Sequence, residues 1–171
     1  ARVNPPDVLG LSCLFWNMRL DMLVFEKMKK INPDCLLVIG GQSIDTDLTE
    51  QRALYDLMNK SVDFMVVNEG ELGFAQLIGK LLSDGRSNIF EGPIDGCTFF
   101  QNKEDLITGQ DIGLSLDLEL LPSPMLTGLL EEFLTPDYLP LFQTTRTCPY
   151  SCAFCTSGRD QAKLRAFPVS V

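Results

Sequence analysis

The sequence predicts an α/β fold in which a parallel sheet is covered by helices on both faces. Two observations lead to this prediction. Short apolar segments alternate three times with segments whose apolar residues have helical spacing, and the connections between them are short. The 171 residues, 45% of them hydrophobic, are enough to bury the core of such a domain.

Three continuously apolar segments predict the strands, at residues 8–15, 35–39 and 63–67. They lack alternating polar positions, which favours strands that are buried on both faces. We expect the three strands to lie parallel in sequential order, joined by right-handed crossovers. Three strands make a thin sheet and the chain begins with Ala1, so we expect it to be part of a longer protein that supplies earlier strands.

Helical spacing of apolar residues predicts one helix after each strand. The first runs from Arg19 to Ile31, and the Asn-Pro-Asp turn that follows ends it because proline disfavours a helical residue before it. The second runs through Tyr55 to Asn59, with Thr49 as its N-cap. The third covers Leu72 to Leu82 and ends before Gly85.

A change in composition after Gly85 predicts the end of the first domain. Residues 86–143 hold ten acidic side chains and five prolines. Within them, Cys97 to Gln101 and Leu106 to Thr108 flank a polar turn and predict a small hairpin. We therefore expect a partial α/β domain at 1–85, an acidic, proline-containing linker with a hairpin at 86–137, and a separate segment at 138–171.

Composition excludes several classes of function. The net charge is −9, whereas nucleic-acid binding needs clustered Lys and Arg. The sequence has no His, which excludes a His general base and every metal site that needs imidazole. No apolar run reaches the roughly 18 residues of a membrane span, and the start lacks the apolar segment of a signal peptide. We expect a cytoplasmic protein without nucleic-acid or membrane partners.

Three of the six cysteines lie within eight positions, at Cys148, Cys152 and Cys155, in a CxxxCxxC spacing. A tetrahedral zinc site needs four ligands, and no His is present to complete one. Three thiolates on a short loop suit a 4Fe–4S cluster whose fourth iron stays open to a substrate or cofactor. The alternatives are zinc with Cys13 or Cys97 as the fourth ligand, and thiols with a structural role.

This motif, with Phe154 just before its last Cys, resembles the signature of the radical S-adenosylmethionine superfamily. The resemblance implies that Cys148, Cys152 and Cys155 ligate a 4Fe–4S cluster whose open iron binds S-adenosylmethionine. It also implies that Phe154 lies near the adenine and that Leu139 to Arg146 is the first strand of a truncated β/α barrel. Reductive cleavage of S-adenosylmethionine in that superfamily yields a 5′-deoxyadenosyl radical, with electrons from a donor such as flavodoxin or ferredoxin.

Two short motifs in the first domain resemble those of cobalamin-binding domains, whose fold is flavodoxin-like. Ser12-Cys13-Leu14 follows one predicted strand and Gly40-Gly41 the next, similar to the SxL…GG pattern of that family. Both fall at carboxyl ends of strands, where open α/β sheets bind ligands. The resemblance implies cobalamin contacts at Ser12, Leu14, Gly40 and Gly41, while the DxHxxG motif of the family would lie upstream of this chain.

The turn after the third predicted strand, with Glu69 and Glu71, resembles the Gly-Glu-Gly-Glu turn of cobalamin-binding radical enzymes, except that Asn68 replaces the first Gly. The resemblance implies that Glu69 is a cofactor-binding residue. Acidic residues at a helix start are equally favoured by the helix dipole.

Together the resemblances imply part of a cobalamin-dependent radical S-adenosylmethionine enzyme. We expect the parent protein to transfer a methyl group to an unactivated carbon or phosphorus centre of a small molecule or peptide. Other radical rearrangements or ring formations stay open, and no catalytic side chain is identified. The rival hypothesis is a non-catalytic α/β module that binds a nucleotide or a partner protein and holds a structural zinc site.

Two expectations concern the chain on its own. We expect no turnover by it, because only 16 residues follow Cys155 and a β/α barrel needs about 200. We also expect self-association through the strand at 8–15, because its outer edge lacks a neighbouring strand.

Overall fold

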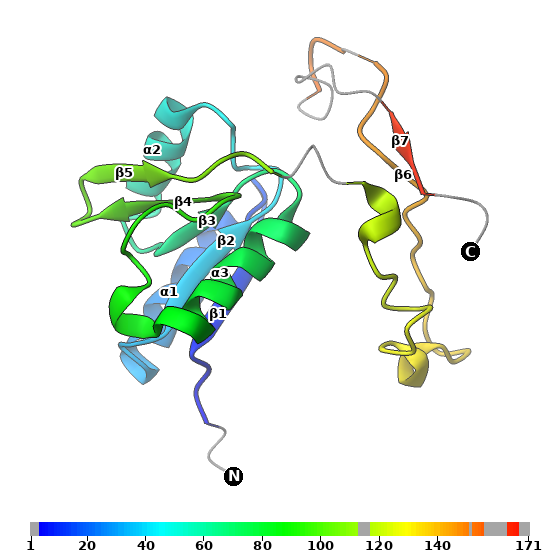
Figure 1. The fold of residues 1–171 in the computed structure, drawn as a ribbon, viewed down its shortest axis with the longest axis horizontal. Coiled ribbons are helices and arrows are strands. Elements are labelled where there is room, and N and C mark those ends of the chain that lie inside the picture. Colours follow the sequence, from blue (N-terminus) through cyan, green and yellow to red (C-terminus); the bar gives the residue numbers. More distant parts are fainter. Residues whose placement is uncertain (1–3, 113–116, 151, 156–163, 168–171) are drawn as a thin grey trace. The chain divides into compact units, whose positions relative to one another are not determined.

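The fold is described from a computed structural model, for residues 4–112, 117–150, 152–155 and 164–167. The chain divides into two units, residues 1–114 and 115–171. The first unit holds a five-stranded sheet in the order β1-β2-β3-β4-β5 (Figure 1). Its strands are β1 (Val8–Ser12), β2 (Leu36–Gly40), β3 (Phe64–Val66), β4 (Cys97–Gln101) and β5 (Asp105–Thr108).

The predicted fold class, a partial flavodoxin-like α/β fold, is confirmed. β1, β2 and β3 lie parallel in sequential order, with Val8 opposite Leu36 and Val38 opposite Phe64. The helices between and after them are α1 (Met18–Ile31), α2 (Leu48–Leu57) and α3 (Gly70–Asp84), followed by the short 3-10 helix η1 (Arg86–Asn88).

The two faces of the sheet bury separate cores. Leu37 and Ile39 of β2 pack in one core with Phe25 of α1 and with residues of α2. Their neighbours in the strand, such as Leu36, face the other core together with Leu77 of α3. This alternation within an entirely apolar strand is the reason that the sequence shows continuous apolar runs rather than alternating ones.

The predicted hairpin is present, and it extends the sheet. β4 and β5 pair antiparallel, and β4 also pairs antiparallel with β3, with Val66 opposite Cys97. Asn102 and Lys103 both have positive φ, 51° and 65°, as a tight hairpin turn that matches the strand twist requires. The carboxyl edge of the parallel strands therefore also holds the start of β4 and the end of β5.

A pair of glycines lets α3 approach the start of β4. A Cβ on Gly73 would lie 2.8 Å from the carbonyl oxygen of Gly96, and a Cβ on Gly96 would lie 2.7 Å from the Cα of Gly73. Gly96 also has a φ of +74°. Any larger residue at either position pushes the hairpin away from the helix.

The predicted helices exist, with one correction at a cap. The N-cap of α2 is Asp47 rather than Thr49, because Asp47 Oδ1 accepts a hydrogen bond from Thr49 N at 2.7 Å. The hydrogen bonds from Thr49 hold the pKa of Asp47 below its ordinary value. The helix then ends at Leu57, two residues before the predicted end.

The second unit contains little regular structure in its described residues. Its elements are the 3-10 helices η2 (Leu118–Leu120) and η3 (Glu131–Phe133) and the antiparallel pair β6 (Thr145–Arg146) and β7 (Arg165–Ala166). Of the strand predicted from Leu139 to Arg146, only the last two residues pair. None of the helices described in either unit combines the length and apolar character needed to cross a bilayer.

Asp63 ties together the amino ends of two strands and the end of α1. Its Oδ2 accepts from Leu37 N at 2.7 Å and from Lys29 Nζ at 3.1 Å, while its own N donates to Leu37 O at 2.8 Å. Lys29 Nζ donates in turn to Cys35 O at 2.7 Å. One half-buried carboxylate therefore links α1, β2 and β3.

We expect Asp63→Ala to lower the free energy of unfolding by about 1–3 kcal/mol, because Leu37 N loses its partner in a partly buried place. Urea unfolding followed by circular dichroism measures the change. Asp34→Ala, at an exposed position in the turn after α1, serves as the control. Equal unfolding midpoints for the two variants would contradict the role given to Asp63.

Candidate functional site

The SxL and GG motifs come together at the carboxyl edge of the sheet. Ser12 pairs with Gly40 in the register of β1 and β2, and Cys13 N donates to Gly40 O at 2.6 Å. Gly41 has a φ of +109°, and a Cβ on it would lie 3.0 Å from Cys13 O and 3.2 Å from Ser12 Oγ. Glycine is needed here both for the backbone conformation and for the close approach.

The loop that follows Ser12 is held by Asn17, a residue that the sequence did not point to. Asn17 Nδ2 donates to Ser12 O at 2.7 Å, and its Oδ1 accepts from Leu14 N at 2.8 Å. Leu14 is thereby fixed, half-buried, beside the end of β1. An Asn three residues after an apolar residue and just before a helix is the signal that marks such a loop.

Beneath this loop lies a buried pair of titratable groups, Cys13 and Asp21. Burial raises the pKa of the Cys13 thiol to about 11; the Asp21 carboxylate adds to the rise and a hydrogen bond with Ser43 opposes it. Burial also raises the pKa of Asp21, which is 5% exposed and whose Oδ2 has no hydrogen-bond partner. Its position one turn before the buried Phe25 places Asp21 on the inner face of α1.

Glu69 lies at the same edge of the sheet, after β3, where it is the N-cap residue of α3. Its side chain makes no capping hydrogen bond, and Glu71 follows in the first turn. The position suits both a contact with a cofactor and a favourable interaction with the helix dipole, so its cofactor role stays a prediction.

The three clustered cysteines lie in the second unit. Cys148 and Cys155 are half-buried and Cys152 is exposed, and Cys155 N donates to Cys152 O at 3.0 Å in a turn. Phe154 is 92% exposed. Within the described residues, no three acidic, Cys or His side chains converge in an arrangement that holds a metal ion. The cluster assignment therefore depends on the spacing and chemistry of the thiols.

The two cysteines considered as a fourth zinc ligand are buried in the first unit. Cys13 is 0% and Cys97 is 1% exposed. Cys97 Sγ donates to Gly73 O at 3.3 Å, and burial raises its pKa to about 12. Both thiols therefore lie in the core of the first unit, and zinc ligation by either of them stays a prediction.

Comparison with known proteins shows relatives along nearly the whole chain. It is 30% identical to a 2-(S-pantetheinyl)-carbapenam-3-carboxylate methyltransferase of Streptantibioticus cattleyicolor, over 98% of this chain and 24% of that protein. It is also 30% identical to the cobalamin-dependent radical SAM methyltransferase TokK of Streptomyces tokunonensis, over 95% of this chain and 24% of that protein. The chain is homologous to a segment of methyltransferases.

A third relative points the same way. An uncharacterized methyltransferase of Pyrococcus horikoshii is 27% identical over 92% of this chain and 33% of its own length. No protein-family model matches the chain. The chain spans about a quarter of the length of the first two relatives, so the activity, substrates and partners of a whole enzyme are proposals.

The raised pKa values predict selective alkylation. At pH 8 the thiols of Cys13 and Cys97 stay protonated and buried, so iodoacetamide should leave them unmodified while it reacts with the exposed Cys152. Mass spectrometry of peptides from the folded chain measures this, with the chain unfolded in guanidinium as the control in which all cysteines react. Rapid modification of Cys97 in the folded chain would contradict the burial described above.

Proposed function

We propose that this chain is the cofactor-binding part of a methyltransferase that uses cobalamin and radical S-adenosylmethionine chemistry. The observation that carries the proposal is the register that sets Ser12 beside Gly40 and Gly41 at the carboxyl edge of a parallel sheet. The description of one relative as a cobalamin-dependent radical SAM methyltransferase supports it. So does the CxxxCxxC spacing of the second unit.

The edge of the first unit suits a bulky cofactor with a nucleotide tail. Ser12 is exposed, so its hydroxyl is available to hydrogen-bond a base. Gly40 and Gly41, which have no side chains, leave the backbone beside Ser12 open to close approach. Leu14 supplies an apolar side chain, and its backbone N–H is held by Asn17 Oδ1. In this proposal these residues hold cobalamin, and Glu69 bounds the site on the β3 side.

The donor set of the second unit suits an iron–sulfur cluster. Cys148, Cys152 and Cys155 supply three thiolates, and Phe154 supplies an exposed ring for stacking on an adenine. When bound, the cluster supplies the electron that cleaves S-adenosylmethionine, and cobalamin supplies the methyl group. The side chains of this chain bind and orient these groups, and none of them is assigned a proton transfer.

The proposal extends to the partners, the location and the self-association of the protein. An electron donor such as flavodoxin or ferredoxin reduces the cluster, and the substrate is a small molecule or a peptide. Free cysteines and an electron donor of this kind are typical of a reducing compartment, so the proposed location is the cytoplasm. β1 lies at the edge of the described sheet, and we expect self-association through that edge.

The cluster is tested by its iron content. After anaerobic reconstitution with iron and sulfide, we expect Cys148→Ala, Cys152→Ala and Cys155→Ala each to lose most of the bound iron. Cys35→Ala, at a buried position in the first unit, is the control that keeps it. Full iron content in all three variants would reject the assignment, and a colourless protein that retains zinc would favour the structural-site hypothesis instead.

The cobalamin site is tested by fluorescence. The single tryptophan, Trp16, lies in the loop after Ser12 and is 66% exposed, so a corrin bound nearby should quench it. We expect Gly41→Ala to weaken cobalamin binding by about tenfold, the effect of 1.4 kcal/mol, because the added methyl strains the turn and fills the approach to Ser12.

The matched control is Gly79→Ala. A Cβ at Gly79, on α3, meets nothing within 4 Å, so this variant should bind cobalamin as the unchanged chain does. Equal affinity of the Gly41 and Gly79 variants would remove the GG turn from the site.

A further inference from the structure

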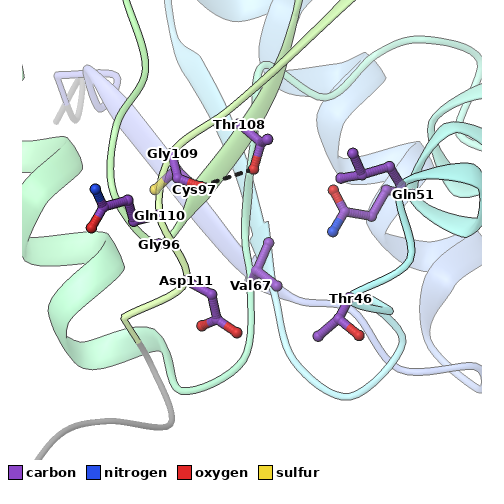
Figure 2. A pocket seen from close by; sticks show the side chains of 10 residues that line it. Thr46, Gln51, Val67, Gly96, Cys97, Thr108, Gly109, Gln110 and Asp111 are labelled. Carbon is purple, nitrogen blue, oxygen red and sulfur yellow. Dashed lines mark hydrogen bonds between the residues drawn. The ribbon is translucent and has the colours of Figure 1, made fainter.

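A small pocket lies at the carboxyl edge of the sheet, where β3 ends, β4 starts and β5 ends. Its volume is about 70 Å³, and its lining includes Thr46, Gln51, Val67, Thr108 and Asp111 (Figure 2). Such a volume holds a few water molecules or one small polar group, whereas a site for a whole organic ligand takes several hundred Å³. The pocket therefore suits the end of a side group on a larger molecule.

The most buried polar group of this pocket is the amide of Gln51. The side chain is 1% exposed, and its Nε2 donates to Asp45 O at 2.7 Å. This bond identifies the amide atom next to Asp45 O as the nitrogen, because a reversed amide would place Oε1 against the carbonyl oxygen of Asp45. Oε1 has no hydrogen-bond partner, and Figure 2 shows the amide directed into the pocket.

Two other polar groups of the pocket are already engaged within the chain. The Thr108 hydroxyl accepts from Thr98 Oγ1 at 3.3 Å and donates to Gly109 O at 3.2 Å. Asp111 Oδ2 accepts from Asn68 Nδ2 at 2.7 Å. Burying an acceptor without a partner costs free energy. A bound group that donates an N–H or O–H to Gln51 Oε1 would therefore bind favourably.

The surroundings favour a neutral donor over an ammonium group. The lining includes the apolar side chains of Val67 and Leu48 and one carboxylate, Asp111, which already accepts from Asn68 Nδ2. The neutral amide of Gln51 does not by itself offset the cost of burying a full positive charge, so a neutral donor suits Gln51 Oε1. A primary carboxamide carries two N–H donors and fits the volume. It also forms the same kind of amide–carbonyl hydrogen bond that Gln51 already makes with Asp45.

The geometry points to this pocket as a subsite for a primary carboxamide, with Gln51 Oε1 as the acceptor. The inference rests on the proposed function, because the corrin ring of cobalamin carries acetamide and propionamide groups around its edge. The pocket opens on the same edge of the sheet as Ser12 and Gly41. The second source of the same group is a free small amide.

The test uses two corrinoids that lack the nucleotide tail. Cobinamide keeps the amide side chains, whereas the heptamethyl ester of cobyrinic acid has the same ring without N–H donors. Both are titrated against the 171-residue chain and followed by quenching of Trp16. We expect the unchanged chain to prefer cobinamide by about two- to tenfold, the range that one hydrogen bond gives.

The variants are Gln51→Leu and, as the matched control, Gln76→Leu at an exposed position on α3. We expect Gln51→Leu to lose the preference for cobinamide and Gln76→Leu to keep it. Equal binding of cobinamide by the Gln51 variant and the unchanged chain would overturn the subsite, with cobalamin binding left standing. If Gln51→Leu does not fold, the two corrinoids on the unchanged chain decide alone, and equal affinity rejects the subsite.

If the proposed function is wrong, the same titrations give a different result. In that case neither cobalamin nor cobinamide quenches Trp16 at any concentration. Propionamide titrated into the ¹⁵N-labelled chain then decides the subsite: a saturable shift of the Gln51 side-chain amide signal supports a site for free amides, and no shift removes it.

Discussion

The carboxylate of Asp63 sets the geometry on which the sheet depends. It bonds the backbone of β2 at Leu37 through both its side chain and its own main chain, and it holds Lys29 at the end of α1. A slip of one residue between β2 and β3 would turn each apolar residue of β3 to the opposite face, and the two cores need different residues. The bond to Leu37 N opposes that slip at the amino ends of the strands, about 10–15 Å of strand away from the site.

The register of the strands determines which residues meet at their carboxyl ends, where the candidate site lies. Because Val8 at the start of β1 lies opposite Leu36 at the start of β2, Ser12 reaches the edge beside Gly40, and Gly41 turns against both Ser12 and Cys13. β4 runs antiparallel to β3, with Cys97 opposite Val66, so β4 starts at this edge of the sheet and β5 ends there. These two strands form a wall at the β3 side of the site. Gly73 and Gly96 permit this wall to pack on α3. One edge of the sheet therefore gathers loops from five places in the sequence: after β1, β2, β3 and β5, and before β4.

The sequence predicts what depends on local pattern. The three apolar runs, the helical spacing after each and the polar turn at Asn102 are sufficient for the parallel strands, the helices and the hairpin. It does not predict what depends on distant residues: the pairing of β4 with β3, the contact of Gly73 with Gly96, or the second bond of Asp63. Gln51 has the character of an ordinary polar residue of a helix, and only the folded structure shows that its Oε1 is buried without a hydrogen-bond partner. The sequence does not distinguish Asp47 from Thr49 as the N-cap of α2, because both residue types suit that role. In the structure Asp47, two residues before the predicted cap, occupies it.

The buried thiol in the middle of the SxL motif has a consequence for cofactor chemistry. A thiolate is both a strong nucleophile and a strong ligand for cobalt or iron, so one next to Ser12 would compete for any methylated or metal-bearing group held there. Burial and the neighbouring Asp21 raise the pKa of Cys13 to about 11, which keeps the thiol protonated at neutral pH. The same burial that fills the core under the loop thereby makes this cysteine chemically inert. Cys97 at the start of β4 is protonated for the same main reason, since burial raises its pKa to about 12.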